Sequence, residues 1–101
     1  RNGIDIRASL GQEIKAVEKG TVVFADRFSG YGRMIVIDHG ERYYTIYAHL
    51  SEMFKKDGDP VKRGEILGLV GDSDSLAGAG LYFEMRKDGR SVDPVPWFRK
   101  P

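Results

Sequence analysis

The sequence contains no cysteine, and histidine is almost as scarce. The absence of cysteine from 101 residues excludes disulfide frameworks, thiol nucleophiles and zinc sites built from thiolates. With only two histidines, His39 and His49, a metal site would have to depend on carboxylates. The missing cysteines do not identify a compartment, because a chain of this length can build a core that replaces disulfides.

The chain also lacks an excess of either charge and any long hydrophobic run. Its 16 basic and 15 acidic side chains are spread evenly, with 7 and 6 in residues 1–50 and 9 and 9 in the remainder. This balance argues against electrostatically driven nucleic-acid binding. No apolar run approaches the length of a membrane-spanning helix, and no signal peptide is visible. The sequence begins at Arg1 without an initiator methionine, so we expect one domain, residues 1–101, cut from a longer protein.

The residues that are present favour a β-sheet protein. Hydrophobic residues make up 41% and charged residues 31%, which excludes a disordered tail. Short apolar runs alternate with Gly, Asp and Ser, no segment shows sustained helical periodicity, and 13 glycines accompany many aromatic and β-branched residues. We expect an all-β, antiparallel fold with strands at 21–25, 34–37, 42–48, 66–70 and 81–86. Hairpin turns are predicted at 38–41 and 87–90, and a short helical turn within 50–56.

Three polar residues stand out as candidates for chemistry. His49 follows the aromatic run at 43–48, a position that suits a buried structural histidine as well as a functional one. His39 precedes a glycine and is typical of a turn residue. Asp5 lies between two isoleucines, where a carboxylate costs desolvation free energy unless a partner compensates it.

Two further patterns have alternative interpretations. Tyr82, Glu84 and Arg86 share one face of the predicted strand at 81–86, as on the polar outer face of an antiparallel sheet. Residues 61–68 contain the pattern V-K-x-G-x-x-L-G, which also occurs in biotinyl and lipoyl carrier domains. The nearest hairpin lysine, Lys87, lacks the Met or Asp that normally precedes a carrier lysine, which argues against a swinging-arm carrier.

Motifs spread in order over the whole chain together resemble a LytM domain, the lysostaphin-type zinc metallopeptidase fold. They are G-I-D-I at 3–6, V-E-K-G-T-V-V at 17–23, G-Y-G at 30–32, Y-A-H-L at 47–50, the segment 61–71, L-Y-F-E at 81–84 and the tail at 89–97. This resemblance implies an antiparallel sheet core with short helical turns.

Active members of that family carry H-x-x-x-D early, a His after the aromatic strand and H-x-H late; two of these histidines and the Asp bind zinc. The resemblance places the five positions at Arg1, Asp5, His49, Gly80 and Tyr82. Arg1 stays protonated and cannot bind a cation, Gly80 has no side chain, and Tyr82 could bind only as a phenolate. We therefore expect no metal, no other cofactor and no peptidase activity.

Degenerate LytM domains of this kind are similar to the EnvC-like murein hydrolase activators, a group that includes NlpD. The resemblance implies a periplasmic domain that activates N-acetylmuramoyl-L-alanine amidases in cell division by binding an amidase helix in the former substrate groove. The residues expected to form that groove are Asn2, Asp5, Tyr31, Tyr47, His49, Tyr82 and Arg86. Two alternatives stay open: a peptidoglycan-binding module, and a zinc endopeptidase with an unusual ligand set.

Overall fold

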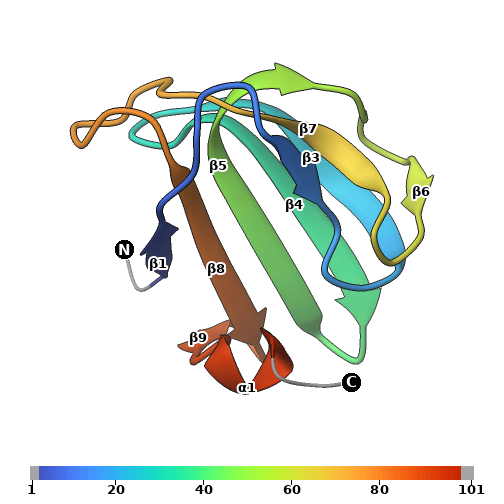
Figure 1. Cartoon of the computed structure of the whole chain (residues 1–101). Helices are drawn as coiled ribbons and strands as arrows, with labels where there is room; N and C mark the ends of the chain where they lie inside the picture. Colours follow the sequence, from blue (N-terminus) through green and yellow to red (C-terminus); the bar gives the residue numbers. More distant parts are fainter. Residues whose placement is uncertain (1–2, 99–101) are drawn as a thin grey trace.

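The computed structural model describes residues 3–98, whose backbone is almost entirely antiparallel β-sheet (Figure 1). The elements of this part of the chain are β1 (Ile4–Ile6), β2 (Glu13–Lys15), β3 (Gly20–Phe28), β4 (Gly32–Gly40), β5 (Tyr43–Met53), β6 (Pro60–Val61), β7 (Ile66–Val70), β8 (Leu81–Lys87), β9 (Arg90–Val92) and α1 (Val95–Phe98). The predicted all-β antiparallel fold is confirmed, and no helix within 3–98 is long and apolar enough to cross a membrane.

Four long strands form the body of the sheet, in the order β8-β5-β4-β3. They are rich in Val, Ile, Tyr and Phe, the side chains that suit a pleated, half-buried surface. β1 and β9 both pair with β8, and β6 pairs with the start of β3. β7 pairs with the end of β5 and with β2, which brings these two strands over one side of the sheet (β7 in yellow, Figure 1).

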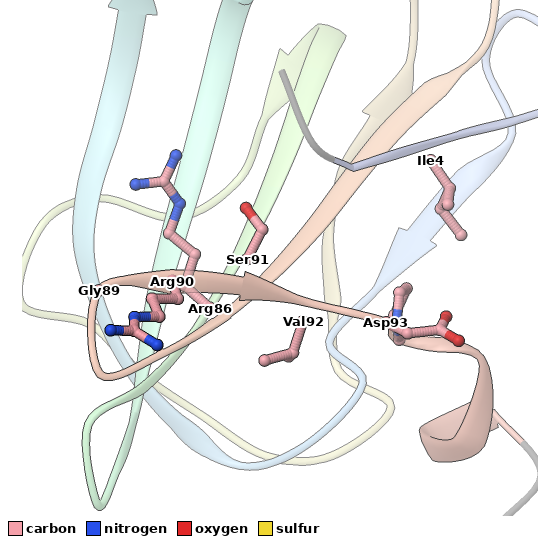
Figure 2. A pocket seen from close by; sticks show the side chains of 8 residues that line it. Ile4, Arg86, Gly89, Arg90, Ser91, Val92 and Asp93 are labelled. Atoms are coloured by element: carbon pink, nitrogen blue, oxygen red, sulfur yellow. The ribbon is translucent and has the colours of Figure 1, made fainter.

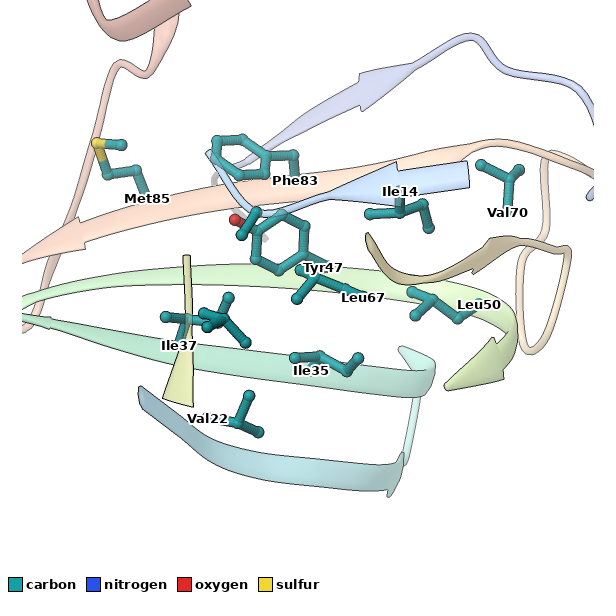
Figure 3. Close-up of a cluster of buried hydrophobic side chains, with 12 residues drawn as sticks. Ile14, Val22, Ile35, Ile37, Tyr47, Leu50, Leu67, Val70, Phe83 and Met85 are labelled. Atoms are coloured by element: carbon teal, nitrogen blue, oxygen red, sulfur yellow. The ribbon is translucent and has the colours of Figure 1, made fainter. Parts of the chain in front are cut away.

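The side of the sheet under β2 and β7 holds the main hydrophobic core (Figure 3). Leu67 and Val70 of β7 and Ile14 of β2 pack there with side chains of the long strands. The cluster consists of Ile14, Ala16, Val22, Ile35, Ile37, Tyr47, Leu50, Val61, Leu67, Val70, Phe83 and Met85. Because strand side chains alternate, the long strands present a different set of residues on their other side.

We call that other side the open face. Met34, Ile46, Ala48 and Tyr82 form its buried centre, and the partly buried Phe24, Tyr31 and Val36 pack against them. The strand register arranges its residues in rows, since directly opposite residues share a face. In these rows Tyr82 lies opposite Ala48, Glu84 opposite Ile46, and Arg86 opposite Tyr44. The open face therefore combines partly exposed apolar side chains with polar groups from β8.

The structure differs from the predicted elements in two places. The helical turn within 50–56 is wrong: β5 continues to Met53 because its end pairs with β7, a contact between segments distant in sequence. The turn predicted at 38–41 lies later, at Glu41 and Arg42, which both have positive φ, as a tight hairpin turn requires. His39 is consequently a strand residue of β4, with its ring nitrogens 2.7 Å from the Lys19 carbonyl oxygen and from Thr45 Oγ1.

Candidate functional site

A buried hydrogen-bond network on β8 occupies the open face. Tyr82, Glu84 and Arg86 share one side of the strand, as their alternation predicts. The Tyr82 hydroxyl donates to Glu84 Oε1 at 2.7 Å, and Arg86 Nε donates to Oε2 at 2.5 Å. Ser91 of β9 adds a third bond, from its hydroxyl to Oε2 at 2.8 Å. Glu84 is 0% exposed, so the pattern belongs to a buried network and not to the solvated outer face that it suggested.

The ionisation of this network follows from its burial and its hydrogen bonds. Burial acts to raise the pKa of Glu84, but the bonds donated by Tyr82, Arg86 and Ser91 outweigh it and lower the pKa below its ordinary value. Burial, together with the bond to the Glu84 carboxylate, raises the pKa of Tyr82 to about 12. At neutral pH Glu84 is therefore charged and Tyr82 is a neutral phenol.

The Tyr82 hydroxyl also connects β8 to the first strand. It accepts a hydrogen bond of 2.8 Å from the backbone N–H of Gly3, so the one oxygen both accepts and donates. A Cβ at position 3 would lie 2.7 Å from this oxygen, which explains why the approach needs glycine. Tyr82 is 2% exposed, and its side chain is thus built into the sheet instead of projecting into solvent.

His49 is held in a strained and closely bonded position at the edge of the open face. Its φ is +69°, a conformation that costs a non-glycine residue roughly 1–3 kcal/mol. Its backbone N–H bonds the Tyr31 carbonyl oxygen at 2.8 Å, and its Nδ1 lies 2.8 Å from the Ser73 carbonyl oxygen. Because a carbonyl only accepts, Nδ1 carries the proton, and in the neutral ring Nε2 carries the lone pair. The side chain is buried, at 3% exposure.

Asp5 and His49 line one hollow of about 280 Å³ between β1 and the loop at 71–80. Asp5 lies opposite Tyr82 in the sheet register and is exposed, so it does not pay the desolvation cost inferred from its sequence neighbours. Gly80 lies in the same hollow and contributes only backbone. Within residues 3–98, no group of three or more His, Cys, Asp or Glu side chains could hold a metal ion.

Aromatic rings extend from this region to the surface. The ring centroids of His49 and Tyr82 are 6.3 Å apart, those of Tyr82 and Tyr31 5.7 Å, and those of Tyr31 and Phe28 5.8 Å. Phe24 continues the series 6.0 Å from Phe28. We refer to Phe24, Phe28, Tyr31 and Tyr82 as the aromatic series; its most exposed member, Phe28, is 50% exposed.

Tyr47 does not belong to this surface, and its assignment to a groove shared with Tyr31 and Tyr82 is wrong. On β5 it alternates with Ile46 and Ala48, so it points to the opposite side of the sheet. Its ring packs 5.3 Å from that of Phe83 in the main core. Its hydroxyl is bonded by the Val17 backbone N–H at 3.2 Å and by Thr45 Oγ1 at 3.0 Å.

Replacing Tyr47 by phenylalanine is expected to reduce stability without affecting the open face. The change leaves the partly buried Val17 N–H without its acceptor, which costs about 1–3 kcal/mol. Urea unfolding should show a lower midpoint with an unchanged slope. A stability equal to that of the unaltered chain would contradict the role given to this hydroxyl.

Arg86 lies beside a second hollow, of about 680 Å³, next to β9 (Figure 2). Ile4, Arg86 and the segment 89–94 line it, and Figure 2 shows Arg86 and Ser91 on one side of the β9 ribbon and Val92 on the other. Of the predicted groove residues, Asp5 and His49 line the first hollow and Arg86 lines the second, whereas Tyr31 and Tyr82 pack on the open face and Tyr47 lies in the main core. Arg1 and Asn2, which the sequence also assigned to the site, lie outside the described residues.

Sequence reasoning missed several residues that organise the site. Glu84 had a visible signal, because a carboxylate between Tyr82 and Arg86 on one strand face can bond both. No signal in the sequence pointed to Ser73. Its carbonyl oxygen accepts a hydrogen bond from His49 Nδ1, and its hydroxyl accepts one from the Arg33 N–H and donates one to the Leu50 carbonyl oxygen. These three partners lie 23 to 40 positions away in the sequence.

Sequence comparison identifies the family. The profile of peptidase family M23 matches residues 1–94. The chain belongs to peptidase family M23. The resemblance to a LytM domain is thereby confirmed, and the structure agrees: the catalytic domain of lysostaphin from Staphylococcus simulans superposes with a TM-score of 0.90 at 27% identity, covering 99% of this chain and 80% of that domain.

Relatives of this M23 domain include both activators and enzymes. Murein hydrolase activator EnvC of Escherichia coli is 38% identical over 95 residues, which cover 94% of this chain and 23% of EnvC. DD-carboxypeptidase/endopeptidase Mpg of Neisseria meningitidis serogroup B is also 38% identical, over 93 residues, 92% of this chain and 21% of Mpg. The M23 domain thus spans less than a quarter of these two relatives, and overall identity does not separate the two activities.

Proposed function

We propose that this M23 domain is a non-catalytic activator of periplasmic N-acetylmuramoyl-L-alanine amidases in the splitting of septal peptidoglycan, and that it binds the amidase on its open face. The observation that carries the proposal is Tyr82. The family resemblance places it in the late H-x-H, and its hydroxyl is committed to Glu84 and Gly3. The same identity to EnvC as to Mpg leaves these site residues to decide between activator and enzyme.

The side chains do not fit the zinc ion that the family's peptidases use. Zinc catalysis ordinarily needs three protein ligands and an open position. Asp5 and His49 line the hollow, but Gly80 has no side chain to offer. To bind zinc as a phenolate, Tyr82 would have to ionise, although its pKa is raised to about 12, and its hydroxyl would have to give up two hydrogen bonds. These side chains therefore do not support a metal-dependent step.

The chemistry of the open face suits a protein partner. Its rows place the apolar Ile46 and Val36 beside one another, with Arg86 in the next row along β8. The aromatic series adds exposed ring surface at Phe28. Aromatic and arginine side chains are the types enriched at protein interfaces, and an amphipathic helix buries its apolar side on such a surface.

Replacing Phe28 by serine is expected to reduce amidase stimulation several-fold while the domain stays folded. The ring is half exposed, so its loss removes contact area for a partner and only the edge contacts with Phe24 and Tyr31 inside the domain, each worth about 0.5–1.5 kcal/mol. Concentration curves of amidase stimulation measure the effect. The matched control is Phe54→Ser, which removes an equally exposed phenylalanine outside the aromatic series. Equal curves for both variants would place the contact elsewhere.

A mixing experiment tests the proposed function itself. A purified amidase is incubated with dye-labelled cell-wall sacculi, with and without the chain, and the released dye is measured. We expect release only when both proteins are present, and no stoichiometric zinc in the purified chain. Release by the chain alone together with bound zinc would instead establish an endopeptidase with an unusual ligand set.

A second function, binding of peptidoglycan, is favoured by one observation. The hollow lined by Asp5 and His49 has a volume of about 280 Å³, and Arg7 and Ser75 add further polar side chains to its lining. Co-sedimentation of the chain with purified sacculi, in the absence of amidase, tests this function. Retention in the pellet that Asp5→Ala abolishes would support a binding module; a chain that stays in the supernatant would exclude it.

A further inference from the structure

The guanidinium group of Arg86 is fixed to the protein through a hydrogen bond of its Nε atom. Its Nε bonds Glu84 Oε2 at 2.5 Å, while its side chain is 43% exposed beside the hollow at β9. Within residues 3–98, the two terminal nitrogens of Arg86 make no hydrogen bond. The side chain therefore presents the outer edge of a guanidinium whose inner edge is fixed to the protein.

The group that fixes Arg86 is itself buried and held by several hydrogen bonds. Glu84 lies in the middle of β8, is fully buried, and receives bonds from Tyr82 and Ser91 as well as from Arg86. These donors come from β8 and β9, and Tyr82 is bonded in turn to Gly3 at the start of β1. The position of the Glu84 carboxylate is thus determined by three neighbouring segments of the sheet edge.

We propose that Glu84 is a positioning residue for partner binding: it orients Arg86 so that the two terminal nitrogens bind a carboxylate of the hydrolase partner at the hollow beside β9. Two parallel N–H groups in one plane match a carboxylate, which they bind in bidentate fashion. An arginine already oriented by the protein loses less side-chain entropy on binding than a mobile one. This inference rests on the proposed function, because it concerns the same open face.

Two substitutions of Glu84 separate positioning from charge. Glu84→Gln keeps the shape of the side chain but removes a negative charge next to Arg86. If Arg86 acted by charge alone, that change would strengthen its attraction for an acidic partner; a positioning role predicts weaker binding. Glu84→Asp keeps the charge but withdraws the carboxylate from Arg86 by one methylene. Charge alone then predicts unaltered stimulation, whereas positioning again predicts a loss.

The experiment is a double-mutant cycle on stimulation of a purified N-acetylmuramoyl-L-alanine amidase, with dye-labelled sacculi as substrate. We expect Glu84→Gln and Glu84→Asp to raise the concentration needed for half-maximal stimulation by roughly tenfold, as loss of a bidentate contact does. In an Arg86→Ala background, Glu84→Gln should cause no further loss, because the residue it positions is gone. Tyr47→Phe, which removes a buried hydrogen bond on the other side of the sheet, serves as the control for a merely less stable domain.

Each outcome bears on a different claim. Unaltered or stronger stimulation by either Glu84 variant, or losses that add in the double variant, would overturn the positioning role while leaving the proposed function in place. A loss in Tyr47→Phe as large as in the Glu84 variants would also overturn it, since reduced stability would then suffice. An unaltered chain that stimulates no amidase would overturn the proposed function and this inference together.

Discussion

Replacing Arg86 by glutamate is expected to weaken amidase stimulation strongly. The change places a second carboxylate beside the buried Glu84, which loses the Nε donor 2.5 Å away and faces a like charge instead. A partner carboxylate would then meet repulsion at the point where Arg86 attracted it. We expect at least a tenfold loss of potency, the size of effect typical of a charged residue at the centre of an interface. Concentration curves of dye release with a purified amidase measure it.

The matched control for this charge reversal is Arg63→Glu. Arg63 is an exposed arginine in the segment between β6 and β7, so its reversal changes the net charge by the same amount without touching the open face. Stimulation by the Arg63 variant should stay close to that of the unaltered chain. If both reversals reduce stimulation equally, the effect is long-range electrostatics and the open face is not the binding site. Circular dichroism and urea unfolding establish that the Arg86 variant remains folded.

Replacing Gly32 by alanine is expected to destabilise the domain by about 3 kcal/mol or more, which is large for a single methyl group. Gly32 has φ +66°, where a side chain is strained, and its added Cβ would lie 2.6 Å from the Ser73 carbonyl carbon and closer still to the carbonyl oxygen. Ser73 would have to move away from β4. That movement breaks the bond to the Arg33 N–H and disturbs the support of His49. Urea unfolding measures the loss.

Gly30 provides the control for the contact, because it shares the backbone conformation but not the neighbour. Its φ is +83°, and a Cβ there would meet nothing within 4 Å. Gly30→Ala should therefore cost only the left-handed strain, about 1–2 kcal/mol. The two glycines flank the same tyrosine in the G-Y-G motif. Equal losses of stability in the two alanine variants would mean that strain, and not the packing of Ser73 against Gly32, explains the motif.

The strands could be predicted from the sequence wherever local chemistry decides them. β4 and the first half of β5 are runs of β-branched and aromatic residues, and β8 shows its alternation directly in Tyr82, Glu84 and Arg86. The end of β5 could not be predicted, because its residues become a strand only by pairing with β7. The turn between β4 and β5 likewise differs from the prediction: it follows Gly40, because the register of the two strands places positive φ at Glu41 and Arg42.

The site divides in the same way. The residue types at positions 5, 49, 80 and 82 are written in the sequence, and with the family's motif they predict a site with an incomplete set of zinc ligands. Which side chains share a surface depends on how the strands pair, and this placed Tyr47 in the core and left Tyr31 with Tyr82 on the open face. Exposure was similarly undecided by sequence: Asp5 is exposed despite its apolar neighbours, and Glu84 is buried despite its charge.

The sequence, with almost no histidine and no cysteine, determined by itself the residue types at positions 5, 49, 80 and 82, because ligand chemistry is a property of individual side chains. Strand alternation also determined that Tyr82, Glu84 and Arg86 point the same way. Only the tertiary structure decided what those side chains do there. The Glu84 carboxylate can be buried because Tyr82 and Arg86 of β8 and Ser91 of β9 all donate to it. Ser91 reaches Glu84 only once β8 and β9 are paired, and the Gly3 N–H, from the other end of the chain, holds the Tyr82 hydroxyl only once the sheet is assembled.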